Sequence, residues 1–418
     1  MMASTVEGGG RRIALAGPVG SANGLGLAAF AWLTQHQPAT NLCLSPAGLT
    51  LCLGLALNGA GGNTYALLAE ALGLKKSNLE TANEAIAAWR AALLKPEAGV
   101  EIAIASSLWT DVSVIVRADL VTRLKRWHDA HAAGLDFREP SSISTINAWI
   151  AEKTQGKLDH VVHSLDPAAR LLLLNVLHFQ GKWSRAFNPE WTQDRPFQLV
   201  DGRRMSHPLM MASGEFPHFR TDEVEGIALP YGEGKWRMVV LLPGHGASLQ
   251  ALLTGLRPRI WKAWMRRLRA DKGTILLPRF HLEATTDLGG PLADLGLAPA
   301  FNPAQADFGG VSVSATDLAI GQLVQHAFVD VDEQGTEAAA ATLMVQAVAW
   351  PPPRWQPFHM QVDRPFFFAI EDVQTATLLF LGAVFDPATP DRELVPRRRG
   401  FMPPPGTPPE VWPESAAS

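Results

Sequence analysis

Two pairs of histidines have a spacing that could serve metal binding. His128 and His131 would share one face of a helix, and His160 and His163 are also three residues apart. A zinc site takes four ligands, at least three of them from the protein, and neither pair has a third nearby. We therefore interpret both pairs as surface histidines, and we expect no metal site and no cofactor.

The sequence also lacks the motifs of the common hydrolases and redox proteins. It contains no Gly-x-Ser-x-Gly, no His-Glu-x-x-His and no Cys-x-x-Cys. The two cysteines, Cys43 and Cys52, lie in one apolar stretch, where buried free thiols are the expected state. We accordingly do not expect an enzyme.

A run of very small side chains begins at Gly335 and ends at Thr342. Alanine and glutamate favour helices, so residues 337–348 could form one. A surface helix needs a polar face, however, and residues 338–345 provide almost none. The prolines at 351–353 would also end such a helix at once.

The same run fits a strand better. Successive side chains of a strand point to opposite faces, so the charged Glu337 would fall on one face only. The other face would have Gln346 as its only strongly polar member and would otherwise carry Thr336, Ala338, Ala340, Thr342, Met344 and Val348. This segment can therefore lie exposed as a loop or be buried as a strand.

The composition favours a globular protein without a nucleic-acid or membrane partner. The chain has 418 residues, of which 47% are hydrophobic, enough for one large domain or two ordinary ones. Its net charge of -4 creates no global field that attracts nucleic acid. A basic helix face with Arg123, Lys125 and Arg126 is interpreted as solvated surface rather than a polyanion site. The sequence contains no run of eighteen apolar residues, so it predicts no membrane span.

The ends of the chain differ in character from its middle. We expect residues 1–20 to be a disordered arm, residues 21–388 to be one folded domain, and the proline-rich residues 389–418 to be a disordered tail. The apolar run after Arg11 and Arg12 is short and broken, so it matches a secretory signal poorly. This favours a cytoplasmic location, with secretion as the alternative.

The periodicity places helices early in the chain and strands late. Helices are expected at 23–37, from Ser45 and Pro46 to about residue 58, at 117–133 and at 143–154. Strands are expected at 101–109, 171–180, 227–231, 237–243, 273–278, 328–332, 358–362, 366–370 and 377–385. This order predicts an α+β fold with a large mixed sheet.

These landmarks together resemble the serpin family of protease inhibitors over residues 23–387. The first matching piece is Asn-Leu-Cys-Leu-Ser-Pro at 41–46. The others follow in order at 59–64, 146–150, 154–157, 175–183, 229–231, 333–342, 363–368 and 382–387. Their order and spacing over the whole chain make the resemblance specific.

The resemblance implies a fold of three β-sheets and about nine helices that carries an exposed reactive loop. It also implies a suicide-type inhibitor of serine proteases. In that mechanism a protease attacks the loop and forms a covalent acyl-enzyme, and the loop then inserts into the central sheet before hydrolysis finishes. We expect the inhibitor to be a monomer, with a serine protease as its partner.

The same resemblance assigns the residues of the loop. Its hinge would comprise Glu333, Gly335, Thr336, Ala338, Ala340 and Thr342. By spacing from the hinge, the attacked bond is expected between Ala349 and Trp350, with Arg354 as an alternative because the following segment is longer than usual. A single methyl group at Ala349 suits an elastase-like protease.

A polar cluster beneath the sheet is implied to control its opening. Ser45 and Asn175 match the family pattern. Gln325 falls where the family usually has a histidine, with His326 one place further on, and Gly48 replaces a usual serine. We therefore expect a weakened or rebuilt cluster. A non-inhibitory serpin-like binding or storage protein is the alternative, although the small residues at 336–342 favour an inhibitor.

Overall fold

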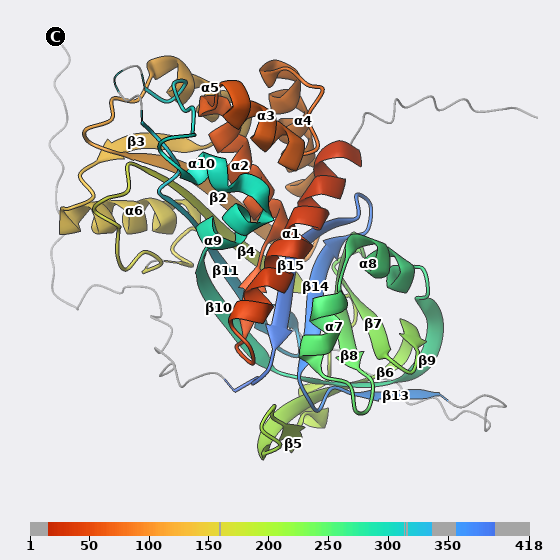
Figure 1. Ribbon diagram of the computed structural model, residues 1–418. Helices are drawn as coiled ribbons and strands as arrows, with labels where there is room; N and C mark the ends of the chain where they lie inside the picture. Colours follow the sequence, from red (N-terminus) through yellow and green to blue (C-terminus); the bar gives the residue numbers. More distant parts are fainter. Residues whose placement is uncertain (1–15, 159, 313, 315–316, 337–356, 389–418) are drawn as a thin grey trace, which may run out of the picture.

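The protein is described by a computed structural model that covers residues 16–158, 160–312, 314, 317–336 and 357–388. Helices dominate the first part of the chain and strands the second, as the periodicity predicted (Figure 1). The early helices are α1 (Ala16–His36), α2 (Pro46–Gly59), α3 (Gly62–Ala71), α4 (Leu79–Leu93), α5 (Ala118–His128) and α6 (Pro140–Lys153). The later ones are α7 (Leu249–Gly255), α8 (Pro258–Met265), and the short α9 (Gly289–Leu292) and α10 (Ala298–Phe301).

Helix α1 begins earlier than expected. Residues 16–20 were predicted to belong to a disordered arm, but they form the first turns of α1. Val19 is buried in the main hydrophobic core together with Ala22, and this burial favours an ordered start of the helix. Residues 1–15 and 389–418, for which disorder was predicted, lie outside the described residues.

The central helix α2 is buried along its whole length. Its sequence is apolar on every face, which is typical of a helix inside a core. The Ser45 hydroxyl accepts a hydrogen bond from Gly48 N at 3.0 Å, and Pro46 occupies the first turn. This capping was predicted, and it fixes where the helix starts beneath the sheet.

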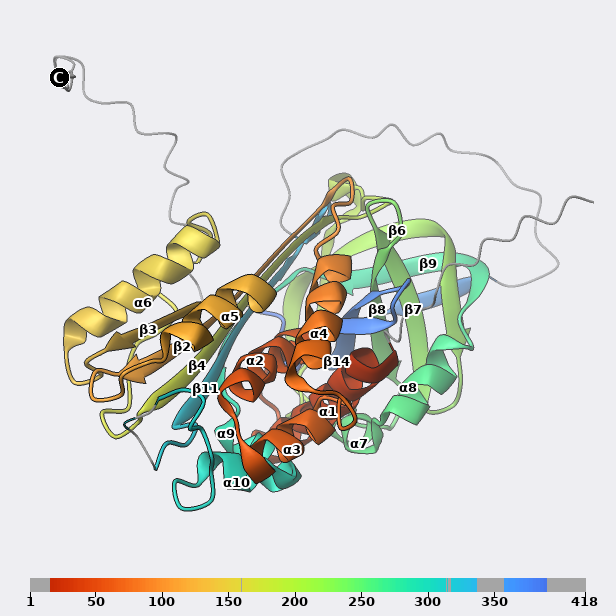
Figure 2. The same ribbon diagram turned by 90° about the horizontal axis from the view of Figure 1, so that it is seen from above.

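A six-stranded sheet lies between α2 on one face and α6 on the other (Figure 2). Its order is β10-β11-β12-β4-β2-β3, and β11 also pairs with β4. The strands are β2 (Val100–Asp111), β3 (His131–Leu135), β4 (Leu171–Lys182), β10 (Phe280–Asp287), β11 (Gln322–Val331) and β12 (Gly335–Thr336). Strand β4 is buried on both faces, which explains its unbroken apolar run from residue 171 to 174.

A nine-stranded sheet forms the other half of the molecule. Its order is β1-β15-β14-β8-β7-β6-β9-β13, with β5 paired to β6. The strands are β1 (Leu42–Leu44), β5 (Gln193–Gln198), β6 (Arg204–Arg220), β7 (Val224–Tyr231), β8 (Trp236–Pro243), β9 (Arg269–Pro278), β13 (Phe358–Gln361), β14 (Phe366–Asp372) and β15 (Thr377–Val384).

The expected α+β architecture is confirmed, but the described strands form two hydrogen-bonded sheets instead of three separate ones. The long strand β6 accounts for this difference. Its last three residues pair with β7, while the rest pairs with β5 and β9. One strand thus joins two groups of strands into a single hydrogen-bonded path. No helix of the described residues is long and apolar enough to cross a bilayer.

Candidate functional site

The short strand β12 lies at one end of the boundary along which β11 and β4 are hydrogen-bonded, which is called the β4–β11 seam below. Over most of their length these two strands pair directly and in parallel, with Gln322 opposite Leu172 and Phe328 opposite His178. Beyond that point they separate, and Gly335 and Thr336 fill the gap. Strand β12 is antiparallel to both neighbours. Two of the predicted hinge residues, Gly335 and Thr336, therefore lie inside the six-stranded sheet.

A tight turn connects β11 to β12. The Asp332 side chain accepts hydrogen bonds from the backbone N–H groups of Gln334 at 2.8 Å and Gly335 at 3.1 Å. The Asp332 N–H in turn donates to Gly335 O at 2.9 Å. Gly335 has a φ of 152°, and a Cβ there would lie 1.9 Å from Gly181 O. Only glycine can meet both conditions at this position.

The carboxylate of Glu333 is held on the outer side of this turn. The Arg279 guanidinium donates to it from Nε at 2.9 Å and from Nη2 at 2.5 Å, and Thr192 donates from its hydroxyl. Burial opposes ionisation of Glu333, but these hydrogen bonds outweigh it and hold the pKa of Glu333 below its usual value. The turn is thus fixed by a charge pair as well as by its backbone.

The side chain of Thr336 points into the core. It is fully buried, and its hydroxyl lies 2.8 Å from the Tyr231 hydroxyl. The Tyr231 ring stacks on Trp183 with 4.3 Å between ring centroids. Burial raises the pKa of Tyr231, so its hydroxyl stays protonated and can donate a hydrogen bond to Thr336.

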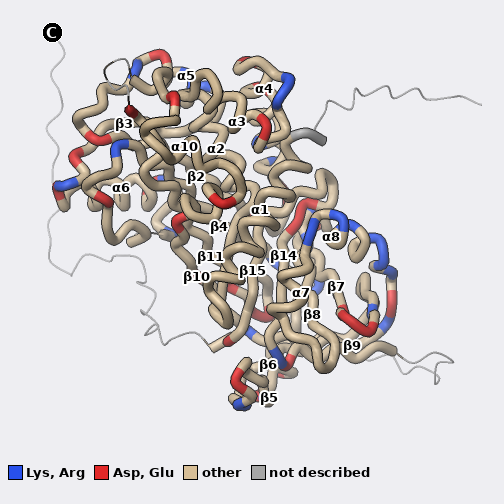
Figure 3. Tube along the Cα trace, in the orientation of Figure 1, with Lys and Arg blue, Asp and Glu red and all other residues tan. Residues whose placement is uncertain are grey.

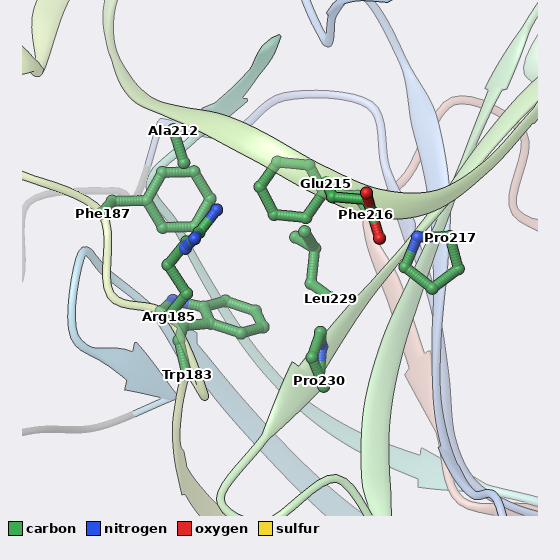
Figure 4. Close-up of a pocket in the computed structure, with 9 residues that line it drawn as sticks. All are labelled: Trp183, Arg185, Phe187, Ala212, Glu215, Phe216, Pro217, Leu229 and Pro230. Atoms are coloured by element: carbon green, nitrogen blue, oxygen red, sulfur yellow. The ribbon is translucent and has the colours of Figure 1, made fainter. Parts of the chain in front are cut away.

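Two aromatic residues hold the turn and also line a small pocket beside it. Trp183 donates from its backbone N to Gln334 O at 2.9 Å, and Phe187 donates to Glu333 O at 2.8 Å. The pocket has a volume of about 90 Å³. Figure 4 shows its lining residues, which are Trp183, Arg185, Phe187, Ala212, Glu215, Phe216, Pro217, Leu229 and Pro230. Trp183 and Phe187 therefore belong both to the wall of this pocket and to the residues that hold the turn.

The predicted polar cluster is assembled where α2 begins beneath the seam. Gln325 on β11 accepts a hydrogen bond from Ser45 N at 2.6 Å and donates to Ser45 O at 3.0 Å. It also donates to Asn175 Oδ1 at 3.3 Å across the strands. Asn175 itself donates to the Ser106 hydroxyl at 2.9 Å. Ser45, Asn175 and Gln325 are all almost completely buried.

The cluster is rebuilt around glutamine, and this explains the glycine in α2. A Cβ on Gly48 would lie 2.0 Å from Asn175 Oδ1 and 2.8 Å from Gln325 Nε2. A serine at this position would therefore displace the two amides. His326 points to the other face of β11, where its Nδ1 lies 2.9 Å from the Thr285 hydroxyl. It cannot substitute for Gln325 in the cluster.

Comparison with known proteins agrees with this geometry. The family model described as "Serpin (serine protease inhibitor)" matches residues 21–387. This chain belongs to the serpin family.

Relatives of this serpin come from distant organisms. The leukocyte elastase inhibitor of Bos taurus is 32% identical over 86% of this chain and 96% of its own length. An uncharacterized serpin-like protein of Thermococcus kodakarensis is 30% identical over 83% of this chain and 81% of its own. The crystal structure of tengpin, a thermophilic serpin in its native state, matches with a TM-score of 0.78 at 25% identity, covering 88% of this chain and 94% of that one. The fold and the family are thus established for the whole domain.

The interpretation of His128 as a surface residue was wrong. His128 is buried between α2, α4 and α5, where its Nε2 lies 3.0 Å from Asn58 Nδ2 and 2.9 Å from Asn83 Oδ1. Helix α5 ends at His128 because Asp129 adopts a left-handed conformation, so His131 lies on β3 instead of the expected helix. Among the described residues no group of three or more His, Cys, Asp or Glu could hold a metal ion.

The basic face of α5 is neutralised by aspartates. Arg117 and Arg123 pair with Asp119, and Lys125 pairs with Asp129 at 2.8 Å. Arg126 lies over the ring of Trp127. These contacts agree with the interpretation of this face as solvated surface.

Several predicted site residues lie outside the described residues. These are Ala338, Ala340 and Thr342 of the hinge, the expected reactive bond Ala349–Trp350, and the alternative Arg354.

The state of the two cysteines was predicted correctly, since Cys43 and Cys52 are free and buried.

Sequence reasoning missed the residues that hold the turn from outside it. Arg279 and Thr192 are far from Glu333 in the sequence, and no local pattern marks them as its partners. Tyr231 was noted as part of a family motif, but its hydrogen bond to Thr336 follows only from the packing.

Proposed function

We propose that this serpin is a suicide-type inhibitor of serine proteases that inserts its cleaved loop between β4 and β11, with elastase-like specificity. The observation that carries the proposal is the direction of β12. From Gly335 to Thr336 the chain moves from Lys182 to Gly181 along β4, towards the paired part of the seam. A strand that continued in this direction would enter between β4 and β11.

A strand that continued from β12 without a bulge would keep the register in which β12 pairs. Thr336 lies opposite Gly181 on β4 and opposite Val331 on β11. Each further residue of an antiparallel strand would move one residue back along both neighbours. Ala340 would then lie between Leu177 and Ala327. The even-numbered side chains would share the buried face of Thr336, which supports the assignment of 338, 340 and 342 to the inserting face.

In this register the inserted loop would reach the polar cluster. Thr342 would lie between Asn175 and Gln325, which are direct partners while β4 and β11 pair with each other. Insertion would break the hydrogen bond of 3.3 Å between the two amides, and Thr342 has a hydroxyl that can bond to either. The cluster would therefore stabilise the closed seam before cleavage and receive the threonine afterwards.

Insertion would supply the free energy that traps the protease. An inserted strand would pair with both β4 and β11 in antiparallel fashion, so two ladders of hydrogen bonds would replace the one parallel ladder that joins these strands before cleavage. The acyl-enzyme formed at Ala349 would be carried along with the moving strand before its hydrolysis is complete. The likeness to the Bos taurus leukocyte elastase inhibitor and the single methyl group of Ala349 both support an elastase-like target.

The test is incubation with pancreatic elastase and with trypsin, followed by a denaturing gel and mass determination of the released C-terminal fragment. We expect a stable adduct with elastase and a fragment that begins at Trp350. A fragment that begins at Trp355, with an adduct to trypsin only, would move the reactive bond to Arg354 and overturn the elastase assignment. Cleavage by both proteases without any adduct would overturn inhibition and leave a binding or storage role.

A further inference from the structure

The small pocket beside the hinge turn, called the hinge pocket below, is lined mostly by apolar side chains (Figure 4). The connector after β4, strand β6 and the end of β7 form its wall. Its buried apolar side chains are those of Trp183, Phe187, Ala212, Phe216 and Leu229. Water in this space would have few polar partners, so burial of an apolar group there is favourable.

Strand β6 leaves room for the one cation of the pocket. Ala212, Gly214 and Phe216 are two residues apart along β6, so they share one face of the strand. A Cβ on Gly214 would lie 1.7 Å from Nη1 of Arg185. The guanidinium of Arg185 therefore occupies the place that a side chain at position 214 would fill, and it lies directly against the strand that lines the pocket.

Arg185 presents unused hydrogen-bond donors at the mouth of the pocket. It is exposed, and its one hydrogen bond to the described residues runs from Nη1 to Ser213 O at 3.3 Å. A guanidinium has five N–H donors in a planar fork, and those that remain suit a carboxylate. The carboxylate of Glu215 also lies near the pocket, but it points away from Arg185 in Figure 4. Arg185 can therefore bind an anion from solution.

We propose that the hinge pocket binds a small monocarboxylate whose apolar part has about four carbon atoms. A cavity of about 150 Å³ can hold a benzene ring, so the hinge pocket, with about 90 Å³, suits a smaller group such as a branched four-carbon chain. This chain would lie among the rings of Trp183, Phe187 and Phe216. The carboxylate would stay at the mouth and accept hydrogen bonds from Arg185.

Charge alone does not distinguish this site. Figure 3 shows Lys and Arg at many places along the chain, in both halves of the molecule. A small acid could meet an exposed cation at any of them, but such a contact contributes little in water. The hinge pocket combines one cation with buried apolar walls, and this combination is what would retain a small acid.

Other classes of ligand fit the hinge pocket less well. An amine would place a second cation beside Arg185, where the two charges repel each other. A neutral molecule of the same shape would bury its apolar part but could not form a charge-assisted hydrogen bond. Drug-sized ligands occupy clefts of about 300 to 1,000 Å³, far above the volume of this pocket.

The experiment is isothermal titration calorimetry of the intact full-length protein with isovalerate, a carboxylate that carries an isobutyl group. Isovaleramide and isobutylamine carry the same isobutyl group with no charge and with a positive charge, and acetate carries the carboxylate with a single methyl group. The test variants are Arg185→Gln, which removes the cation, and Ala212→Leu, which fills the pocket. The matched control is Arg204→Gln, at an exposed arginine that begins β6 and does not line the pocket.

We expect isovalerate to bind saturably with a Kd below about 10 mM. Arg185→Gln should weaken this binding by about 10-fold or more, because it removes the charged donor. Ala212→Leu should abolish the binding, whereas Arg204→Gln should change the Kd by less than about 2-fold. The amide, the amine and acetate should each bind at least about 10-fold more weakly than isovalerate.

Four results would overturn the proposal: no saturable binding of isovalerate below about 10 mM, equal losses in the two arginine variants, unchanged affinity in the filled pocket, or equally tight binding of a control compound. If Ala212→Leu lowers the melting temperature, Ala212→Val replaces it, with an expected loss of about 3-fold or more. The measurement needs no protease, so its failure would leave the inhibitory function untouched.

Discussion

Glu333 and Gly335 have different tasks in the same turn. Gly335 provides a backbone conformation and a close approach that no other residue allows, and Glu333 provides a charge held by Arg279 and Thr192. The resemblance to the serpin family assigned both positions to the hinge. It could not predict Arg279, because the ion pair depends on how the end of β9 meets the turn after β11.

Arg279→Gln should destabilise the intact protein. The variant leaves the almost completely buried carboxylate of Glu333 without its charged partner, at a cost of about 1 to 3 kcal/mol. We expect a lower midpoint of urea unfolding at pH 7. Because the pKa of Glu333 lies below its usual value, the pair stabilises the fold at neutral pH and loses this effect as the pH falls through that lowered pKa.

Arg185→Gln provides the matched control, since Arg185 is an exposed arginine near the same turn that donates only to a backbone carbonyl oxygen. Its unfolding midpoint should stay close to that of the parent. Equal losses in the two variants would mean that the Arg279–Glu333 pair contributes nothing specific.

Ala340→Glu should convert the inhibitor into a substrate. In the register set by β12 this side chain would be buried between Leu177 and Ala327, so a charge there would have to be buried without a partner. Slower insertion would allow hydrolysis of the acyl-enzyme to finish. The measurement is the number of inhibitor molecules consumed per protease trapped, which should rise strongly.

Ala340→Ser tests the same position without adding a charge. It should keep the stoichiometry of the parent within about 2-fold, because a serine is small and can find a hydrogen bond in the sheet. An unchanged stoichiometry in Ala340→Glu would show that the inserting face is wrongly assigned.

At the scale of elements, the contact among α2, α4 and α5 depends on a neutral histidine. Burial lowers the pKa of His128 to about 4, with a smaller contribution from Arg90. The unfolded chain would bind a proton at this residue near pH 6.5, well before the folded protein does. Stability should therefore fall as the pH drops from about 6.5 to about 4, by at most roughly 3 kcal/mol from this group.

His128→Gln should remove this part of the pH dependence. The variant is expected to be less stable at pH 7, because His128 bridges Asn58 and Asn83, but to lose less stability on acidification. The measurement compares free energies of unfolding at pH 7 and pH 4.5, with His245→Gln, at an exposed histidine, as the control. A parallel decline in all three proteins would contradict a buried neutral His128.

The helix periodicity predicted α1, α2, α5 and α6, but it failed at the end of α5. Residues 129–133 continue a helical pattern, yet β2 offers an unpaired edge, and His131–Leu135 pairs with it in parallel as β3. The pairing of β4 with β11 could likewise not be predicted from the sequence. Each strand has a clear apolar pattern, but only the register brings Asn175 opposite Gln325.

At the scale of the whole molecule, the intact protein holds a strand position open at one end of its six-stranded sheet. Strand β12 occupies only two residues of it, and β4 and β11 close the remainder in parallel. The state with an inserted loop would have one more full strand and antiparallel pairing on both sides of it. On this account the intact protein is not in its most stable arrangement. Cleavage of the loop would allow insertion and would release the difference in free energy between the two arrangements.

Thermal melting before and after cleavage of the loop tests this claim most directly. Elastase, or any protease that cuts within residues 345–356, can produce the nicked protein, and mass spectrometry confirms a single cut. If the loop inserts between β4 and β11, the cleaved protein gains several kcal/mol and should melt roughly 10 °C or more above the intact one. An equal or lower melting temperature after cleavage would contradict insertion.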